Sequence, residues 1–191
     1  MRCLMCENLS LTHICKICQE SYLKPSLYRR KLSNGVEVLS FYKYEDIKEL
    51  LHTKHTDIGF YIYSILAKNS FTKFINNFDF DEPLVSIAID DNIESGYSHT
   101  AILSKSLQTR NIKPLFNHLR AQNRVSYSGK SKEFRVLNPR KFTLRNFKAE
   151  DVILVDDIIT TGATLTQACE ILQSKQKEIV FCLTLCDVAN K

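Results

Sequence analysis

The sequence predicts an α/β fold with a mostly parallel sheet, preceded by a small cysteine-rich module. Three observations carry this prediction. From residue 36 onward, short apolar strands alternate with amphipathic helical segments, which is the pattern of a parallel sheet covered on both faces. One strand ends in two aspartates followed by a Thr/Gly turn and a helix, and two Cys-x-x-Cys pairs lie within the first 18 residues. The 191 residues are enough for one ordinary α/β domain and a small appendage.

The individual elements follow from periodicity and from turn residues. Alternating or continuous apolar runs predict strands at 36–44, 84–89, 113–116, 134–137, 152–155 and 178–185. Amphipathic spacing predicts helices at 44–52, 57–77, 97–109 and 161–174. The polar, basic stretch 117–133 is predicted to be a loop, and a loop of that length inside a compact domain is usually functional or disordered.

Composition is that of a soluble globular protein, with 44% hydrophobic and 25% charged residues. The first residues lack the apolar core of a secretory signal, so we expect a cytoplasmic protein. In that compartment the seven cysteines are expected to be thiols or metal ligands rather than disulfides. Cys169, Cys182 and Cys186 fall in the C-terminal helix and strand and are predicted to be small core residues.

The net charge of +5 conceals two blocks of opposite sign. Residues 105–148 contain twelve lysines and arginines and one acid, which gives +11, and the remainder of the chain carries −6. Such a distribution suggests an anionic partner at the basic block. Within that block the best candidates for phosphate contacts are Arg120, Arg124, Lys130, Lys132 and Arg135, and Tyr127 is the best candidate for base stacking. A solvated basic face with its aromatic residues in the core is the alternative.

The two Cys-x-x-Cys pairs predict a zinc module at residues 1–22. Cys3, Cys6, Cys15 and Cys18 can present four thiolates to one tetrahedral zinc ion. Because all four positions are cysteines, no coordination site stays open, and the zinc is expected to be structural. Twenty residues cannot bury a core of their own, so the metal would supply folding energy. Four unrelated thiols and a redox role are the alternatives.

The run from Val152 to Leu165 predicts a site for a ribose 5-phosphate. A buried strand ends at Asp156 and Asp157, and a Thr/Gly turn then opens a helix. Free N–H groups and the dipole at a helix N-terminus favour phosphate, while paired carboxylates can accept hydrogen bonds from ribose hydroxyls. The predicted ligand contacts are Asp156, Asp157, Thr160, Thr161, Gly162, Ala163 and Thr164. A metal site of a nucleotide hydrolase and a simple helix cap are the alternatives.

The stretch Val155-Asp156-Asp157-Ile158-Ile159-Thr160-Thr161-Gly162-Ala163-Thr164 resembles the phosphoribosyl pyrophosphate (PRPP) signature of type I phosphoribosyltransferases. With the four-cysteine module, nearly the whole chain resembles the ComF-type competence proteins. The resemblance implies a zinc finger at 1–22 and a Rossmann-like type I phosphoribosyltransferase core with a parallel sheet at 36–191. It also implies that residues 118–137 correspond to the flexible basic loop that closes over the reacting centre.

Two neighbouring stretches depart from that family's pattern. Gly96-Tyr97-Ser98-His99 replaces a Gly-Phe-Asn-Gln that commonly opens one helix, and Asp90, Asp91 and Glu94 stand where basic residues are common. In phosphoribosyltransferases this region supplies the pyrophosphate-binding loop, so the acids weigh against turnover. We therefore assign no catalytic residue from the sequence.

The resemblance implies a role in natural transformation, in which the protein handles incoming single-stranded DNA in the cytoplasm. PRPP with Mg²⁺ would be its ligand and Zn²⁺ a structural cofactor. A DNA-uptake helicase or membrane channel proteins would be its partners, which would place it at the inner face of the inner membrane. A catalytically active phosphoribosyltransferase and an adaptor with a sensor site are the other hypotheses. The sequence leaves the oligomeric state open.

Overall fold

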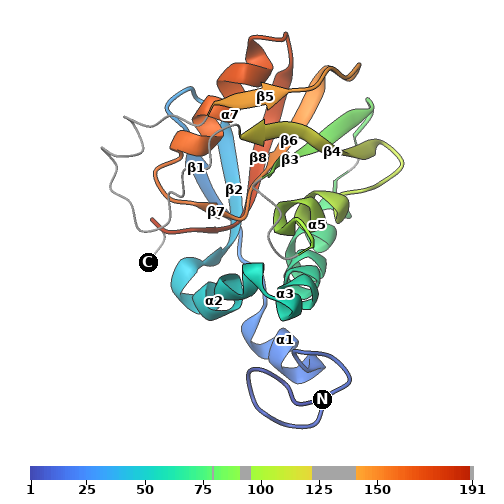
Figure 1. Cartoon of the computed structure of the whole chain (residues 1–191), viewed down its shortest axis with the longest axis vertical. Helices are drawn as coiled ribbons and strands as arrows, with labels where there is room; N and C mark the ends of the chain where they lie inside the picture. The colour runs from blue at the N-terminus through green and yellow to red at the C-terminus, as the bar shows by residue number, and fades with distance from the viewer. Residues whose placement is uncertain (79, 91–95, 122–140, 190–191) are drawn as a thin grey trace.

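A computed structural model of the chain describes residues 1–78, 80–90, 96–121 and 141–189. Eight strands in these residues form one sheet in the order β1-β2-β8-β6-β3-β4-β5, with β7 paired to β8 (Figure 1). The strands are β1 (Tyr28–Lys31), β2 (Glu37–Lys43), β3 (Leu84–Asp90), β4 (Ile112–Ala121), β5 (Phe142–Leu144), β6 (Asp151–Val155), β7 (Ile158–Ile159) and β8 (Glu178–Asp187). The central strands β2, β8, β6, β3 and β4 are parallel, and the outer strands β1 and β5 are antiparallel to their neighbours. The predicted α/β class with a mostly parallel sheet is confirmed.

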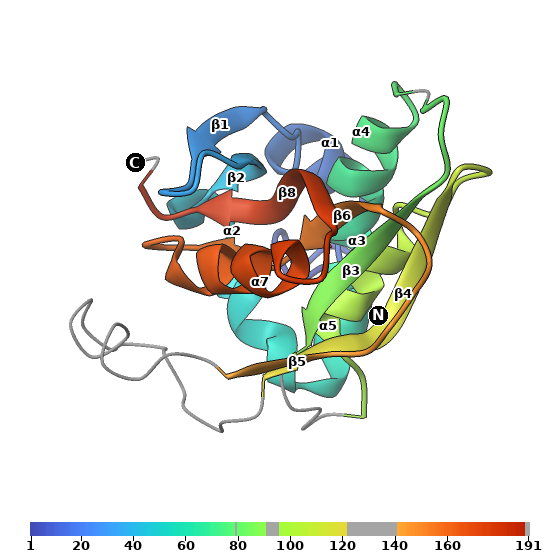
Figure 2. The same ribbon diagram turned by 90° about the horizontal axis from the view of Figure 1, so that it is seen from above.

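Helices cover both faces of this sheet (Figure 2). Helix α7 (Ala163–Gln173) packs on one face. The other face carries α2 (Tyr44–Leu51), the 3₁₀ turn η1 (His52–His55), α3 (Asp57–Ala67), the π-helical turn η2 (Lys68–Thr72), α4 (Lys73–Ile75) and α5 (His99–Lys105). Helix α1 (Lys16–Tyr22) lies at the far end of the molecule, below α2 and α3 in Figure 1. In the described part of the chain, no helix has the length and apolar character needed to cross a membrane.

Alternation along the buried strands creates two cores. On β6, Val152 and Leu154 pack on the α7 side, whereas Ile153 and Val155 join the core beneath α3 and α5. Successive side chains of a strand point to opposite faces of the sheet, so the residues that follow β6 inherit the same alternation. This property decides where the two aspartates point.

Two local predictions are wrong. Residues 117–121 belong to β4 rather than to a loop: Leu119 pairs with Ile89 of β3, and Arg120 pairs with Thr143 of β5. The polar residues of this segment suggested a loop, but they are compatible with a strand because β4 lies near the sheet edge and exposes much of its surface. Residues 16–22 form a helix although no period marks it, because Cys15 caps its N-terminus by accepting a hydrogen bond from the Cys18 N–H. The candidate strand 134–137 lies outside the described residues.

Candidate functional site

The Thr/Gly turn lies at the carboxyl end of β6, where ligands bind in open α/β sheets. Here Asp156 and residues 158–165 line a small pocket of about 20 Å³. The turn is fixed against β8: the Asp156 N–H donates to the Leu183 carbonyl, and the Leu185 N–H donates to the Asp157 carbonyl. The structure therefore brings Asp156 together with Thr160, Thr161, Gly162, Ala163 and Thr164 around one concavity.

Gly162 is required by the shape of this turn. Its φ of 83° is left-handed, and it forms the N-cap of α7. A Cβ atom added there would lie 2.8 Å from a methyl group of Leu32. The glycine thus permits both the backbone conformation and the close approach of β1. The N-terminus of α7 lies at the pocket, where an anion is favoured, and the Ala163 N–H donates to Thr161 Oγ1 at 3.3 Å.

Arg30 stabilises the turn from the neighbouring strand. Its guanidinium donates to the carbonyls of Thr160 at 2.7 Å and Thr161 at 3.4 Å, and pairs with the buried Asp187 carboxylate at 3.1 Å. These contacts fix the backbone of the turn between β6 and α7 against β1. Sequence reasoning missed Arg30, which is 130 residues distant from Thr160. No strand was predicted at residues 28–31, and an arginine there gave no signal for this contact.

The two aspartates point to different environments. Asp156 lines the pocket and accepts, through Oδ1, a hydrogen bond of 2.9 Å from the Asp157 N–H. Asp157 does not line the pocket, because alternation turns its side chain toward α3 and α5. The predicted pair of ribose-binding carboxylates thus consists of one pocket residue and one residue in a buried polar cluster.

That cluster, which we call the Asp157 cluster, consists of Asp157, Lys54, Tyr63 and His99. Lys54 Nζ and the Tyr63 hydroxyl donate to Asp157 Oδ2, each at 3.3 Å. His99 Nε2 lies at the same distance from this oxygen, as an ion-pair contact without the alignment of a hydrogen bond. Burial raises the pKa of Asp157, but the charges of Lys54 and His99 outweigh it and hold that pKa well below its usual range. Asp157 is therefore a carboxylate whose Oδ2 is already engaged.

Tyr97 holds the turn that presents Lys54. Its hydroxyl donates to the carbonyls of Lys54 at 2.7 Å and Thr56 at 3.1 Å. Gly59 makes room for this contact, since a Cβ atom there would collide with the Tyr97 hydroxyl and the Thr53 carbonyl. In the segment Gly96–His99, which departs from the family pattern, Tyr97 thus positions Lys54 and His99 contacts the same Asp157 carboxylate as Lys54 does.

Replacing Lys54 by methionine is expected to destabilise the fold by about 1–3 kcal/mol, because it leaves the buried Asp157 charge without its main counter-ion. Lys54 is partly exposed, which places the effect below that of a fully buried pair. Urea unfolding followed by circular dichroism measures the change, and Lys54→Arg, which retains the charge, is the matched control. Equal unfolding midpoints for Lys54→Met and the wild type would refute the role assigned to this pair.

The four predicted zinc ligands lie together. The sulfur atoms of Cys3, Cys6, Cys15 and Cys18 are all within 4.8 Å of one another, and the Cys6 and Cys15 sulfurs are 3.7 Å apart. A tetrahedral zinc site with bonds of about 2.3 Å places its sulfurs about 3.8 Å apart. The cluster therefore fits zinc, and it is the one group of candidate metal ligands in the described ranges.

Backbone N–H groups prepare the Cys3 sulfur as a ligand. Cys3 Sγ accepts from the N–H groups of Cys15 at 3.2 Å and Met5 at 3.5 Å. Burial raises the pKa of the Cys3 thiol, but backbone hydrogen bonds lower it further, to about 6. A thiol with that pKa is mostly thiolate at neutral pH, which is the form that binds metal.

The cysteine module also packs against the domain. Ile14 and Leu23 are buried in the core shared with α3, and Asn69 donates to the Gln19 side chain at 3.0 Å. His13 stacks on Tyr61 with ring centroids 4.5 Å apart. Docking against the domain therefore contributes to the folding of the module, a contribution that the sequence did not indicate.

Most of the predicted DNA contacts cannot be placed. Arg120 is exposed on β4, whereas Arg124, Tyr127, Lys130, Lys132 and Arg135 lie outside the described residues. So do Asp91 and Glu94. Among the aromatic residues of the basic block, Phe142 is buried and Phe116 is 43% exposed. Cys169, Cys182 and Cys186 are buried, as predicted.

One segment of the chain matches a known protein family. Residues 117–191, less than half of the chain, match the family model of the phosphoribosyl transferase domain. This range includes the pocket residues and excludes Arg30, Lys54, Tyr63, His99 and the four zinc ligands. No curated protein matches the chain.

Several solved structures are similar. A hypoxanthine phosphoribosyltransferase from Staphylococcus aureus is 22% identical, with 65% of this chain and 62% of that chain covered and a TM-score of 0.40. This chain thus spans about three fifths of the length of that protein. Orotate phosphoribosyltransferases from Mycobacterium tuberculosis H37Rv and Aeropyrum pernix are 14% and 15% identical. They cover 90% of this chain each, with 82% and 80% of their own lengths covered and TM-scores of 0.40 and 0.41. The predicted α/β core with a mostly parallel sheet, preceded by an N-terminal four-cysteine cluster, is confirmed, and residues 117–191 match the phosphoribosyl transferase domain.

Proposed function

We propose that the chain binds PRPP through residues 156–164 and handles single-stranded DNA during natural transformation. The observation that carries the first half is the pocket itself. Asp156, three threonines and a left-handed glycine line one concavity at the N-terminus of α7. A ribose 5-phosphate needs an acceptor for its hydroxyls and N–H donors for its phosphate, and this set supplies both.

The residues around the pocket favour one orientation of the ligand, with the phosphate at the Thr/Gly turn and the ribose at Asp156. The 5-phosphate accepts from N–H groups at the N-terminus of α7 and from the hydroxyls of Thr160, Thr161 and Thr164. Asp156 accepts from a ribose hydroxyl. Asp157 lies outside the pocket lining, with Oδ2 engaged by Lys54 and Tyr63, so it supports the end of β6 from the opposite face. Arg30 keeps the turn in its binding conformation without contacting the ligand.

Mg²⁺ would be bound mainly through the ligand. The described residues around the pocket do not form a group of metal ligands of their own. When bound, Mg²⁺ neutralises charge on the pyrophosphate. The acids at 90, 91 and 94 would repel that pyrophosphate, so we propose binding of PRPP in preference to its consumption.

The charge distribution supports the DNA-handling half of the proposal. Residues 105–148 carry +11, and a basic surface that follows phosphates binds single strands without needing sequence. A helicase or channel protein of the uptake machinery would deliver the strand at the inner face of the inner membrane. The four-cysteine module provides a rigid surface on which such a partner could dock.

Reversing Arg120, Arg124 and Lys130 to glutamate is expected to weaken single-strand binding and to flatten its salt dependence. Each lost phosphate contact lowers the slope of log K against log salt by about 0.7, so three contacts lower it by about 2. Fluorescence anisotropy with a labelled oligonucleotide at several salt concentrations measures the slope. The matched control reverses Lys105, Lys113 and Lys148, which are exposed in the same block. Equal slopes in both triple variants would count against the 118–137 segment as the contact surface.

A catalytic phosphoribosyltransferase is the second candidate, favoured by the match of residues 117–191 to that domain. A screen of purine and pyrimidine bases with PRPP and Mg²⁺, read as pyrophosphate release, separates the two. Turnover with any base that disappears in Asp156→Asn would establish the enzyme. PRPP binding without turnover would favour a ligand-binding role for the pocket.

A further inference from the structure

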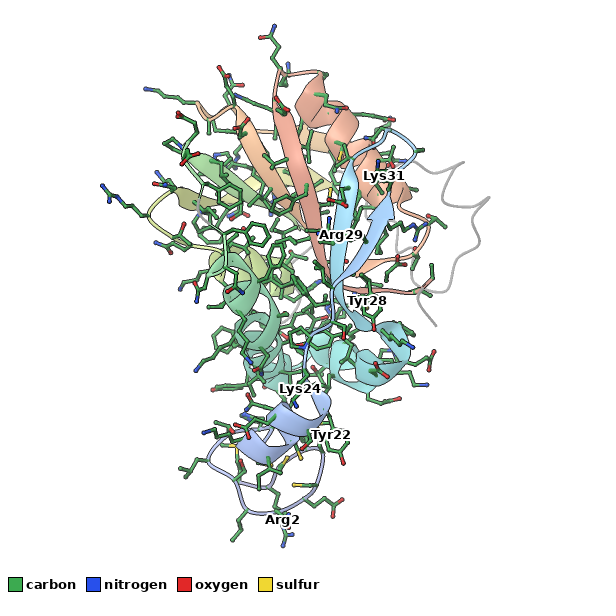
Figure 3. The ribbon with its side chains drawn as sticks, turned by 180° about the vertical axis from the view of Figure 1, so that it is seen from behind. Arg2, Tyr22, Lys24, Tyr28, Arg29 and Lys31 are labelled. Atoms are coloured by element: carbon green, nitrogen blue, oxygen red, sulfur yellow. The ribbon has the colours of Figure 1, made fainter. Side chains whose placement is uncertain are left out.

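A second positively charged surface runs from the cysteine module to the sheet edge, on a part of the chain that the basic block does not include. Figure 3 shows its side chains in a column along one side of the molecule, from the tip of the module to the end of β1. We call it the basic stripe and define it as Arg2, Tyr22, Lys24, Arg29 and Lys31.

The sequence around the stripe is positively charged, unlike the rest of the chain outside the basic block. Residues 22–31 contain four basic residues and no acid, although the chain outside 105–148 carries −6. Glu37 pairs with Arg29 at 3.3 Å in an exposed contact, and Asp187 pairs with Arg30 at 3.1 Å, so two of the four charges are offset. Lys24 and Lys31 are exposed, and positive charge on both sides of Arg29 is retained.

Tyr22 supplies an aromatic ring beside these charges. It lies at the end of α1 and is 65% exposed, so no packing in the described chain accounts for it. Tyr28 lies between Lys24 and Arg29 in Figure 3 and is half-buried. Base–aromatic stacking contributes about 1–3 kcal/mol per base to the binding of single strands.

Strand β1 connects this surface to the pocket. It is an edge strand, and its side chains alternate, with Arg29 and Lys31 exposed. Arg30, between them, points to the other side and holds the carbonyls of Thr160 and Thr161. Lysines on an edge strand also prevent unwanted strand pairing, but that role does not account for Tyr22 and Lys24, which precede the strand.

We propose that the basic stripe is a path for single-stranded nucleic acid, in which Lys24, Arg29 and Lys31 contact successive phosphates and Tyr22 stacks on a base. This proposal rests on the proposed DNA-handling function and adds a second contact surface to it. A linear arrangement of cations with an exposed tyrosine fits an unpaired strand better than an acidic peptide, which needs no stacking ring. The stripe would lead a strand from the cysteine module along the face of β1 opposite to Arg30.

The test compares two double variants. The stripe variant combines Lys24→Glu and Lys31→Glu, and the control variant combines Lys68→Glu and Lys175→Glu, at exposed lysines that lie elsewhere. Both variants change the net charge equally and keep segment 118–137 intact. We expect the stripe variant to lower the salt slope of oligonucleotide binding by about 1.4, at 0.7 per contact, and the control to leave it unchanged. Tyr22→Ala is expected to weaken binding roughly tenfold with an unchanged slope.

A halogenated-uracil oligonucleotide adds a readout that does not depend on affinity, because irradiation crosslinks it to a stacked aromatic ring. A crosslink at Tyr22 supports the stripe. Wild-type binding that persists in both the double variant and Tyr22→Ala, with the slope unchanged and no crosslink at residues 22–31, would overturn the stripe while leaving the DNA-handling function intact. A wild-type protein that binds no oligonucleotide would overturn both.

Discussion

Removing the metal from the cysteine module is expected to unfold residues 1–22 and to lower the melting temperature of the whole chain. Zinc supplies about 10–16 kcal/mol to the folding of small zinc peptides, and four thiolates crowded within 4.8 Å would repel one another without it. Because Ile14 and Leu23 pack into the domain core, unfolding of the module also exposes apolar surface beneath α3. The effect should therefore extend beyond the module.

Cys6→Ser is the variant of choice, because Cys6 is exposed and its replacement removes a ligand without opening the core. Leu11→Ser, at a position 98% exposed in the same module, is the matched control. Zinc content by mass spectrometry, hydrogen exchange of residues 1–26 and thermal unfolding are the measurements. A metal-free preparation with the melting curve of the wild type would rule out a structural zinc.

Asp156→Asn is expected to weaken PRPP binding by about 10- to 150-fold. Hydrogen bonds to a charged acceptor contribute about 1.5–3 kcal/mol each. The substitution replaces a charged carboxylate acceptor by a neutral amide, which accepts more weakly from a ribose hydroxyl. Asn is isosteric with Asp, and Asp156 lies at the pocket rather than in the Asp157 cluster, so folding should survive. Calorimetric titration with PRPP and Mg²⁺ measures the change.

Asp151→Asn, at the start of the same strand, is the matched control and should bind as the wild type does. The double variant with Asp157→Asn should lose both binding and stability, because Lys54 and His99 then lack their counter-charge. Unchanged heats in Asp156→Asn would mean that PRPP does not contact the end of β6.

The sequence predicted the features that depend on neighbouring residues. The strand–Asp–Asp–turn–helix of 152–165 and the two Cys-x-x-Cys pairs are local patterns, and their geometry follows from strand alternation and ligand spacing. Adjacent strand residues point to opposite faces of a sheet, so alternation continued from β6 separates the side chains of Asp156 and Asp157. The structure was needed to show which residues surround each of these two carboxylates.

Contacts between distant segments could not be predicted. Lys54 lies 103 residues from Asp157 and Arg30 lies 130 residues from Thr160, and no local pattern links either pair. Helix α1 escaped prediction because a cysteine, rather than a usual N-cap residue, begins it. The loop predicted at 117–133 failed at its start because strand pairing with Ile89 and Thr143 outweighs a polar sequence.

The DNA-handling role is tested by titration of the wild-type protein with a labelled single-stranded oligonucleotide, at several salt concentrations and with or without PRPP and Mg²⁺. We expect binding that falls steeply as salt rises, together with a shift in affinity when PRPP occupies the pocket beside Arg30. An absence of binding even at low salt, by protein that retains its zinc and binds PRPP, would contradict the DNA-handling role.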